Sequence, residues 1–122
     1  MKLLTHNLMQ SNVKGITQRY PLGIVATAVE VHDNEPNLEF ARNMVPKINY
    51  AVLLAAARQM SYNDLPDEWP AEDAVDDDLL EKLHHCLVNI NIIEGQLVCP
   101  ESGRVFPIEN GIPNMLLRED EV

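Results

Sequence analysis

The chain has 122 residues, of which 46% are hydrophobic, and it carries a formal net charge of −10 at pH 7. This length suits one domain or two small lobes with a modest core. The acidic balance offers no basic stripe for phosphates, so we expect no direct binding of nucleic acid by this chain alone. No apolar run reaches the roughly 18 residues that span a bilayer, and the polar N-terminus is unlike a secretory signal. We therefore expect an intracellular protein without a membrane partner.

The negative charge is concentrated in one stretch. Residues 64–81 contain nine acids and no base, whereas the remainder has ten acids and nine bases and is nearly neutral. We interpret residues 61–78 as an acidic loop whose solvated side chains keep the protein soluble.

In chain order, residues 1–33 are expected to be mostly extended, with a strand rich in β-branched residues over 22–31. Apolar residues at helical spacing predict helices over 38–45 and 47–60, and a third helix that starts at Asp76–Asp78. Trp69 is expected to pin the intervening loop to the core, and Cys86 lies in the apolar stripe of the third helix.

After residue 93 the pattern returns to strands. Residues 96–99 and 104–108 flank the turn 100–103 and predict a hairpin, with a positive φ at Gly103, and Asn110–Gly111 marks a second turn. We therefore predict an α+β fold in which both chain ends, residues 1–33 and 92–122, form a small zinc-ribbon-like β module. Residues 34–91 form an inserted helical lobe that contains the acidic loop.

Cys99 lies in the sequence Cys99-Pro100-Glu101-Ser102-Gly103, which has the layout of half a zinc knuckle, but Ser102 stands where a second thiolate is needed. Cys99 and Cys86 alone cannot complete a tetrahedral zinc site. We expect no bound zinc and only a degenerate site that retains Cys99.

Catalytic constellations are not apparent in the sequence. His84 and His85 differ by about 100° around a helix and cannot face one ligand together, the glycines are scattered, and no serine occupies a nucleophile elbow. We predict that the chain is not an enzyme and holds no cofactor.

Both chain ends carry apolar stretches that a small sheet cannot easily bury. For each of these residues, ordinary core packing and an exposed patch beside a sheet edge remain open alternatives. The exposed patch would accept a strand from another chain. The competing classes are a zinc-ribbon-like nucleic-acid adaptor and a free-standing enzyme, and the missing ligands and catalytic groups argue against both.

Three segments carry a resemblance to a known family: Met1-Lys2-Leu3-Leu4-Thr5-His6-Asn7-Leu8, Glu94 to Ile108, and Asn110-Gly111-Ile112-Pro113-Asn114-Met115-Leu116-Leu117. The chain resembles the eukaryotic methyltransferase activator subunit over nearly its whole length. The resemblance implies a zinc-knuckle-like module with an inserted helical lobe. It also implies a cytoplasmic and nuclear subunit without an active site, which forms heterodimers with class I methyltransferases.

The same resemblance implies that those partners bind S-adenosylmethionine and modify tRNA, rRNA and the translation release factor. In zinc-bearing members, ligands would fall near Ser11, at Gly15 or Ile16, and at Cys99 and Ser102, so this chain retains only Cys99.

We hypothesise that this chain stabilises and activates its partners by edge-strand pairing and apolar contacts. The residues expected to contact the partner come from both ends: Asn7, Leu8, Met9, Ile108, Asn110, Ile112, Pro113, Asn114, Met115 and Leu116.

Overall fold

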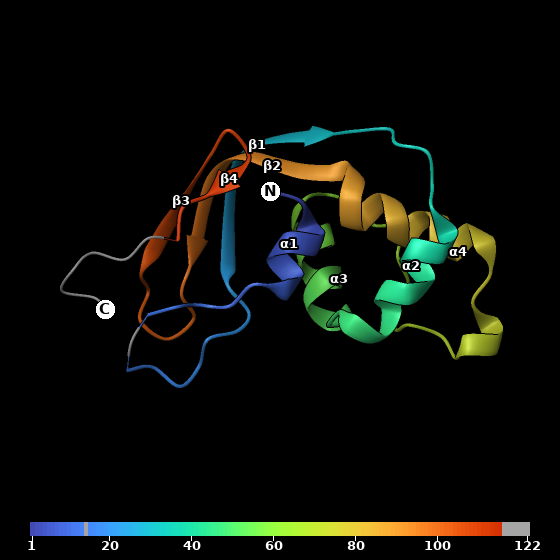
Figure 1. Ribbon diagram of the computed structural model, residues 1–122, viewed down its shortest axis with the longest axis horizontal. Coiled ribbons are helices and arrows are strands. Elements are labelled where there is room, and N and C mark those ends of the chain that lie inside the picture. Colours follow the sequence, from blue (N-terminus) through green and yellow to red (C-terminus); the bar gives the residue numbers. More distant parts are fainter. Residues whose placement is uncertain (14, 116–122) are drawn as a thin grey trace.

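The computed structural model describes residues 1–13 and 15–115, and it combines helices with one antiparallel sheet, which confirms the α+β class (Figure 1). The helices are α1 (Leu3–Leu8), α2 (Leu38–Met44), α3 (Tyr50–Gln59) and α4 (Asp77–His84). Short helical turns are η1 (Val45–Lys47), η2 (Glu72–Ala74) and the π-helical η3 (His85–Asn89). The strands are β1 (Gly23–Val31), β2 (Ile90–Val98), β3 (Val105–Glu109) and β4 (Ile112–Pro113).

The four strands lie in the order β1-β2-β3-β4, and each neighbouring pair is antiparallel. The hairpin between β2 and β3 pairs Val98 with Val105, and Gly103 in its turn has a φ of +74°. Both features of this hairpin were predicted from the sequence. The sheet therefore has two edges, the long β1 and the two-residue β4.

Short polar side chains start the helices. Asn37, Asn49 and Asp76 each accept a hydrogen bond from a backbone N–H of the first turn, at 3.0, 3.2 and 2.9 Å. Such caps satisfy donors that have no partner inside the helix. Asp76 confirms that the acidic run begins the third helix.

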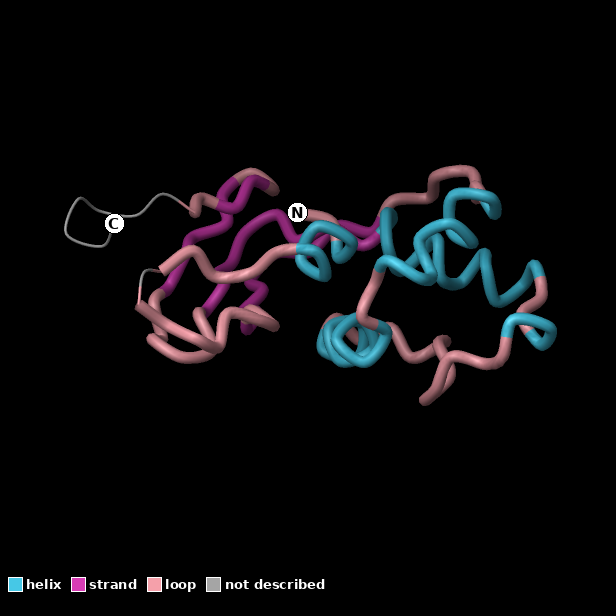
Figure 2. Tube along the Cα trace, turned by 60° about the horizontal axis from the view of Figure 1, so that its bottom comes forward, coloured by secondary structure: helices cyan, strands magenta, loops and turns pink. Residues whose placement is uncertain are grey.

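One core runs from the sheet into the helices. Leu97 and Phe106 are fully buried on the inner face of the sheet, and Leu53 and Leu83 are fully buried in the helical part. Helix α1 contacts both α3 and β2, and in Figures 1 and 2 it lies between the sheet and the other helices. Cys86 is fully buried in this core, as predicted from its place in an apolar stripe.

Two predicted elements were wrong in detail. Residues 3–8 form a helix instead of an extended segment, because Leu3, His6 and Asn7 fall on one face and are buried there. A six-residue helix has little stability of its own, so its tertiary contacts decide its conformation. Strand β2 starts at Ile90, whereas the sequence pattern indicated a strand only after residue 93.

The division into a β module (1–33 and 92–122) and a helical lobe (34–91) stays a prediction. No helix in the described part of the chain is long and apolar enough to cross a membrane.

Candidate partner-binding surface

Helix α1 and the residue after it place the N-terminal candidates. Leu8 is 56% exposed at the end of α1, and Met9 is half-buried against the core. Leu8 therefore presents apolar surface to solvent, which points to a partner only where it forms part of a larger apolar patch.

Asn7 points inward instead. It is 3% exposed, its side-chain amide donates to the Asn49 carbonyl at 2.9 Å, and its side-chain oxygen accepts from the Asn49 N–H at 2.9 Å. The Tyr20 hydroxyl donates to the Asn7 carbonyl at 2.7 Å. The side chain of Asn7 thus joins α1 to the start of α3 and leaves no exposed group for a partner.

The C-terminal candidates lie along β3, β4 and the turn between them. Ile112 is 69% exposed on β4, and Pro113 and Met115 are half-buried beside it. Asn110 and Asn114 are exposed, and the Asn114 N–H donates to the Pro107 carbonyl at 2.8 Å.

Ile108 is only 1% exposed on the inner face of β3, so its side chain belongs to the core of this chain. The alternation of buried and exposed residues along β3 accounts for this position. Leu116 lies outside the described residues.

Hydrogen bonds join the N-terminal segment to the segment that carries the C-terminal candidates. The Asn12 side-chain amide donates to the Met115 carbonyl at 2.7 Å, and the α-amino group of Met1 donates to the Gly111 carbonyl at 2.6 Å. A hollow of about 590 Å³ follows the β4 edge. We call the exposed and half-buried members of this set the docking surface: Leu8, Met9, Ile112, Pro113 and Met115.

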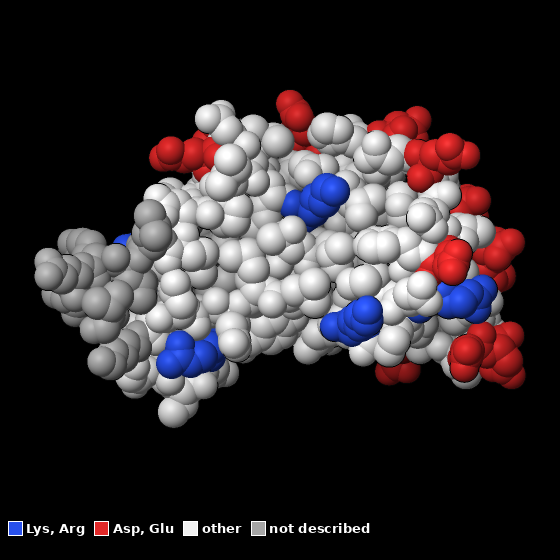
Figure 3. Space-filling model, in the orientation of Figure 1, with Lys and Arg blue, Asp and Glu red and all other residues white. Residues whose placement is uncertain are grey.

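Charge is distributed unevenly around this region. In Figure 3 the acidic side chains gather over the helices at the right and along the upper rim, whereas the middle of the face, over α1, shows few charges. A weakly charged apolar surface costs little to desolvate, so this part of the molecule is better suited to a protein interface than the acidic part.

The turn from Cys99 to Gly103, which the sequence suggested as half a zinc knuckle, is held by hydrogen bonds. Cys99 and Ser11 are almost completely buried, and the Ser102 N–H donates to the Cys99 sulfur at 3.4 Å. Burial acts to raise the pKa of the Cys99 thiol, but hydrogen bonds from Ser102, Ser11 and the Glu101 backbone outweigh it and lower the pKa to about 7. The structure therefore gathers Ser11, Cys99 and Ser102, whereas Gly15 and Ile16 offer no donor side chain.

A carboxylate adds a second link between this turn and residues 17 and 18. Glu101 accepts hydrogen bonds from the Thr17 N–H at 3.2 Å, the Thr17 hydroxyl at 2.9 Å and the Gln18 N–H at 3.2 Å. Hydrogen bonds from Thr17 and Gln18 lower the pKa of Glu101. Sequence reasoning missed this role, because nothing in a Pro-Glu-Ser turn reveals which distant backbone amides the carboxylate will face.

The family model for the Trm112p-like protein matches residues 2–111 of the chain. The chain belongs to the Trm112p-like family. It is 47% identical to the Arabidopsis thaliana "Multifunctional methyltransferase subunit TRM112 homolog A" over the full length of both proteins. It is 46% identical to the Mus musculus "Multifunctional methyltransferase subunit TRM112-like protein", covering 99% of this chain and 98% of the relative.

A solved structure shares the fold. A chain of the E. cuniculi Mtq2-Trm112 complex, described as responsible for the methylation of the translation termination factor eRF1, superposes with a TM-score of 0.54. The identity is 20%, and the match covers 95% of both chains. The similarity supports the arrangement of helices and sheet described above.

The donor set of this Trm112p-like chain does not fit zinc. Structural zinc sites use four thiolate or imidazole ligands, whereas the knuckle here supplies one thiol and two hydroxyls. Within residues 1–13 and 15–115, no three His, Cys, Asp or Glu side chains are grouped as a metal site requires.

The two adjacent histidines contact different elements. The ring of His84 meets Phe40 of α2 edge-on at 6.3 Å between centroids, and the ring of His85 lies 5.3 Å from that of Tyr62. Both residues nevertheless line one hollow together with Asn34 and Lys82, so the expectation that they cannot face one ligand together is not confirmed. Trp69 is half-buried with its ring 5.3 Å from that of Tyr50, which is the pinning contact expected for the acidic loop.

Proposed function

We propose that this Trm112p-like chain is a non-catalytic subunit that stabilises and activates S-adenosylmethionine-dependent methyltransferases. The observation that carries the proposal is Ile112, a large apolar side chain that is 69% exposed on an edge strand. Leu8 and Met115 add apolar surface at the two ends of the chain, and among the described residues Glu109 is the one charged residue that lines the hollow along β4.

Two kinds of contact would bind the catalytic subunit. The outer side of β4 offers backbone groups to an edge strand of the methyltransferase, while the docking surface buries apolar area against it. A stable complex of this kind buries roughly 1,600 Å² or more in total. Pro113 has no N–H, so pairing there relies on the carbonyl groups and on residues around it.

Activation then needs no chemical group from this chain. A methyltransferase whose own edge strand is apolar and unpaired aggregates or populates incompetent states, and binding shifts it toward the competent fold by mass action. S-adenosylmethionine would be bound by the partner, and this chain would contribute neither a cofactor nor zinc.

The proposed partners are class I methyltransferases that modify tRNA, rRNA and the translation release factor, and each would form a heterodimer with this chain in the cytoplasm or the nucleus. The names of the relatives and the Mtq2-Trm112 complex support this assignment. A zinc-ribbon-like nucleic-acid adaptor is not favoured, because the chain is acidic and its knuckle does not fit zinc.

We further propose that the end containing the knuckle is a zinc-ribbon-like module that has lost its metal. The buried hydrogen bonds of Cys99 with Ser11 and Ser102, and the contacts of Glu101 with Thr17 and Gln18, support this proposal. They link residues 11–18 to residues 99–102, where a metal would otherwise join two knuckles.

Co-expression tests the function directly. A Mtq2-like methyltransferase from the same source is produced with and without this chain, and soluble yield and S-adenosylmethionine binding are measured. The proposal predicts that both rise when the chain is present. Equal values in the two samples would contradict it.

A further inference from the structure

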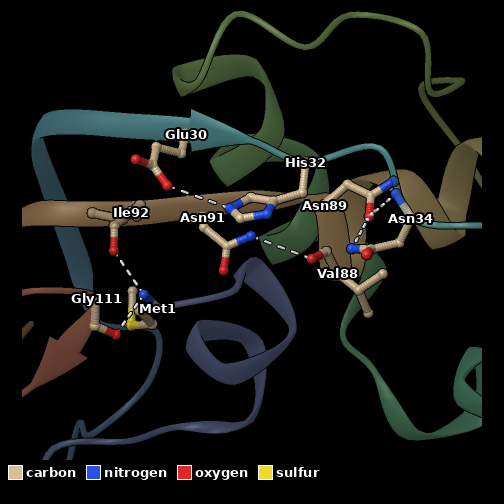
Figure 4. Close-up of polar contacts among 9 residues, drawn as sticks. All are labelled: Met1, Glu30, His32, Asn34, Val88, Asn89, Asn91, Ile92 and Gly111. Atoms are coloured by element: carbon tan, nitrogen blue, oxygen red, sulfur yellow. Dashed lines mark hydrogen bonds and ion pairs between the residues drawn. The ribbon is translucent and has the colours of Figure 1, made fainter.

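The α-amino group of Met1 is built into the sheet. Met1 is 5% exposed, and its amino group donates to the carbonyl oxygens of Ile92 and Gly111, each at 2.6 Å (Figure 4). The Ile92 N–H donates in return to the Met1 carbonyl at 2.8 Å. Met1 thus lies between β2 and the turn that joins β3 to β4, and a charged donor satisfies two carbonyls there.

The turn held by this amino group leads directly into the docking surface. Asn110 and Gly111 both have positive φ, at 52° and 77°, and the Gly111 N–H donates to the Ile93 carbonyl at 2.9 Å. Ile112 follows at once. Since β4 has only two residues, its position depends on the bonds that anchor this turn to β2.

We propose that the α-amino group of Met1 anchors the turn that leads into the docking surface, so that acetylating it or placing residues ahead of it weakens methyltransferase binding. This inference rests on the proposed function, because it assigns a control point to the same surface. It also makes a statement about the isolated chain, namely that the amino group orders residues 110–113.

Acetylation changes the amine in two ways that matter here. Transfer of an acetyl group from an acetyl thioester forms an N–C amide bond and releases a thiol and a proton. The product is neutral and has a single N–H, so it cannot donate to the carbonyls of both Ile92 and Gly111. A residue placed before Met1 has the same effect, because it also converts the amine into an amide.

The β3–β4 turn lies close to the Met1 amine, where an acetyl group would be added. A Cβ atom placed on Gly111 would lie 3.3 Å from the Met1 nitrogen, so the turn already approaches the amine closely. Burial also lowers the pKa of the amino group, which agrees with its enclosed position.

The test compares full-length chains with a free Met1, with Nα-acetylated Met1 and with one glycine ahead of Met1, each titrated with a Mtq2-like methyltransferase by calorimetry. The modified chains are expected to bind about tenfold more weakly or worse, which corresponds to losing one charge-assisted hydrogen bond. Lys2→Gln with a free Met1 is the matched control. It removes one positive charge from the exposed neighbouring side chain and should stay within about twofold of the parent.

A second measurement does not depend on how the modified chains fold. The rate at which an amine-reactive ester acylates Met1 is followed by mass spectrometry in the unmodified chain, folded and in urea at one pH. We expect acylation to be slower by about tenfold or more in the folded chain, because the amine must first be exposed by local opening. Equal rates would overturn the inference.

The two proposals fail in different ways. If the unmodified and modified chains bind the methyltransferase equally well, the inference is wrong and the proposed function stands. If the unmodified chain does not bind at all, the proposed function is wrong, and the acylation rates still decide whether the amino group is enclosed.

Discussion

The helical half and the sheet half of this Trm112p-like chain differ in the kind of side chain that they expose to solvent. The segment from residue 34 to residue 91 carries the acidic run, caps its helices with polar side chains and buries its large aliphatic residues. Among the described residues, the large apolar side chains with the greatest exposure all lie in α1 or the sheet: Leu8, Val25, Val29, Val31, Val105 and Ile112. The helical half exposes mainly polar and charged side chains to water, whereas the sheet half exposes apolar surface that a partner can cover.

The difference has a physical origin. A helix can turn one apolar stripe inward and cover the rest with charge. A four-stranded sheet with helices on one face leaves its other face and its two edges open. A partner can therefore bind this fold at an open sheet edge without displacing any of its own contacts. We expect mutations at that edge to affect partner binding, and mutations in the helical half to affect mainly stability.

The largest effect is expected inside the sheet, where Gly95 of β2 lies between β1 and β3. A Cβ added at Gly95 would lie 2.2 Å from the Val25 carbonyl oxygen, so Gly95→Ala must push β1 away from β2. We expect a loss of about 3 kcal/mol or more in the free energy of unfolding, measured with urea. Gly23→Ala is the control, because its Cβ would meet Val98 at an ordinary 3.4 Å.

If the helical half is independent of the sheet, Gly95→Ala will unfold the sheet while helical circular dichroism and Trp69 fluorescence survive. The shared core predicts instead that both signals are lost in one transition.

Ile112→Asp and Val29→Asp separate the two edges of the sheet. Both parent side chains are exposed, Ile112 on β4 and Val29 on β1. We expect Ile112→Asp to weaken methyltransferase binding by about 30-fold or more, and Val29→Asp to leave it within about threefold. Circular dichroism should find both variants folded. The opposite ranking would move the interface to β1.

Asn7→Ala tests the junction between the halves. The substitution leaves the Asn49 N–H without its partner and removes one of the two hydrogen bonds to the Asn49 carbonyl, which still accepts from the Leu53 N–H, so we expect about 2 kcal/mol less stability by urea unfolding. Asn12→Ala removes one exposed bond to Met115 and should cost about 0.5 kcal/mol. Similar losses for the two variants would contradict the buried role of Asn7.

Asp76→Ala probes the acidic half. It removes the cap that accepts the Leu79 N–H, and we expect a loss of about 1 kcal/mol with unchanged methyltransferase binding. Asp77→Ala, one residue further into the helix, is the matched control and should cost less. Weaker binding by Asp76→Ala would show that the acidic half also takes part in the interface.

The smallest effect concerns pH. Burial lowers the pKa of both His6 and His84 from the ordinary histidine value of about 6.5. Below pH 6.5 the unfolded chain therefore binds more protons than the folded chain. The contribution of the two neutral histidines to the free energy of unfolding is complete above pH 6.5 and decreases as the pH drops below it. Unfolding in urea at pH 7.5 and pH 5.5 should show the lower midpoint at pH 5.5. An unchanged midpoint would mean that neither histidine is held neutral by burial.

The sequence was sufficient for features with a local cause. The β2–β3 hairpin, the Asn110–Gly111 turn and the cap at Asp76 follow from turn chemistry and capping preferences, and the structure has each of them. The apolar docking surface could be proposed from composition, and Leu8 and Ile112 are indeed exposed.

Features with a long-range cause could not be predicted in the same way. Helix α1 is too short to form alone, and Asn7 looked like an interface residue until its partner Asn49 was known. The bonds of Glu101 to Thr17 and of Met1 to Gly111 join residues more than 80 positions apart. Only the folded chain brings such groups together.

Hydrogen–deuterium exchange of the chain, alone and bound to a Mtq2-like methyltransferase, tests the central claim most directly. The account predicts that binding slows backbone exchange in residues 8–13 and 108–115 and leaves the acidic stretch from 64 to 81 unchanged. Protection confined to the acidic stretch or to β1, with no change around Ile112, would contradict it.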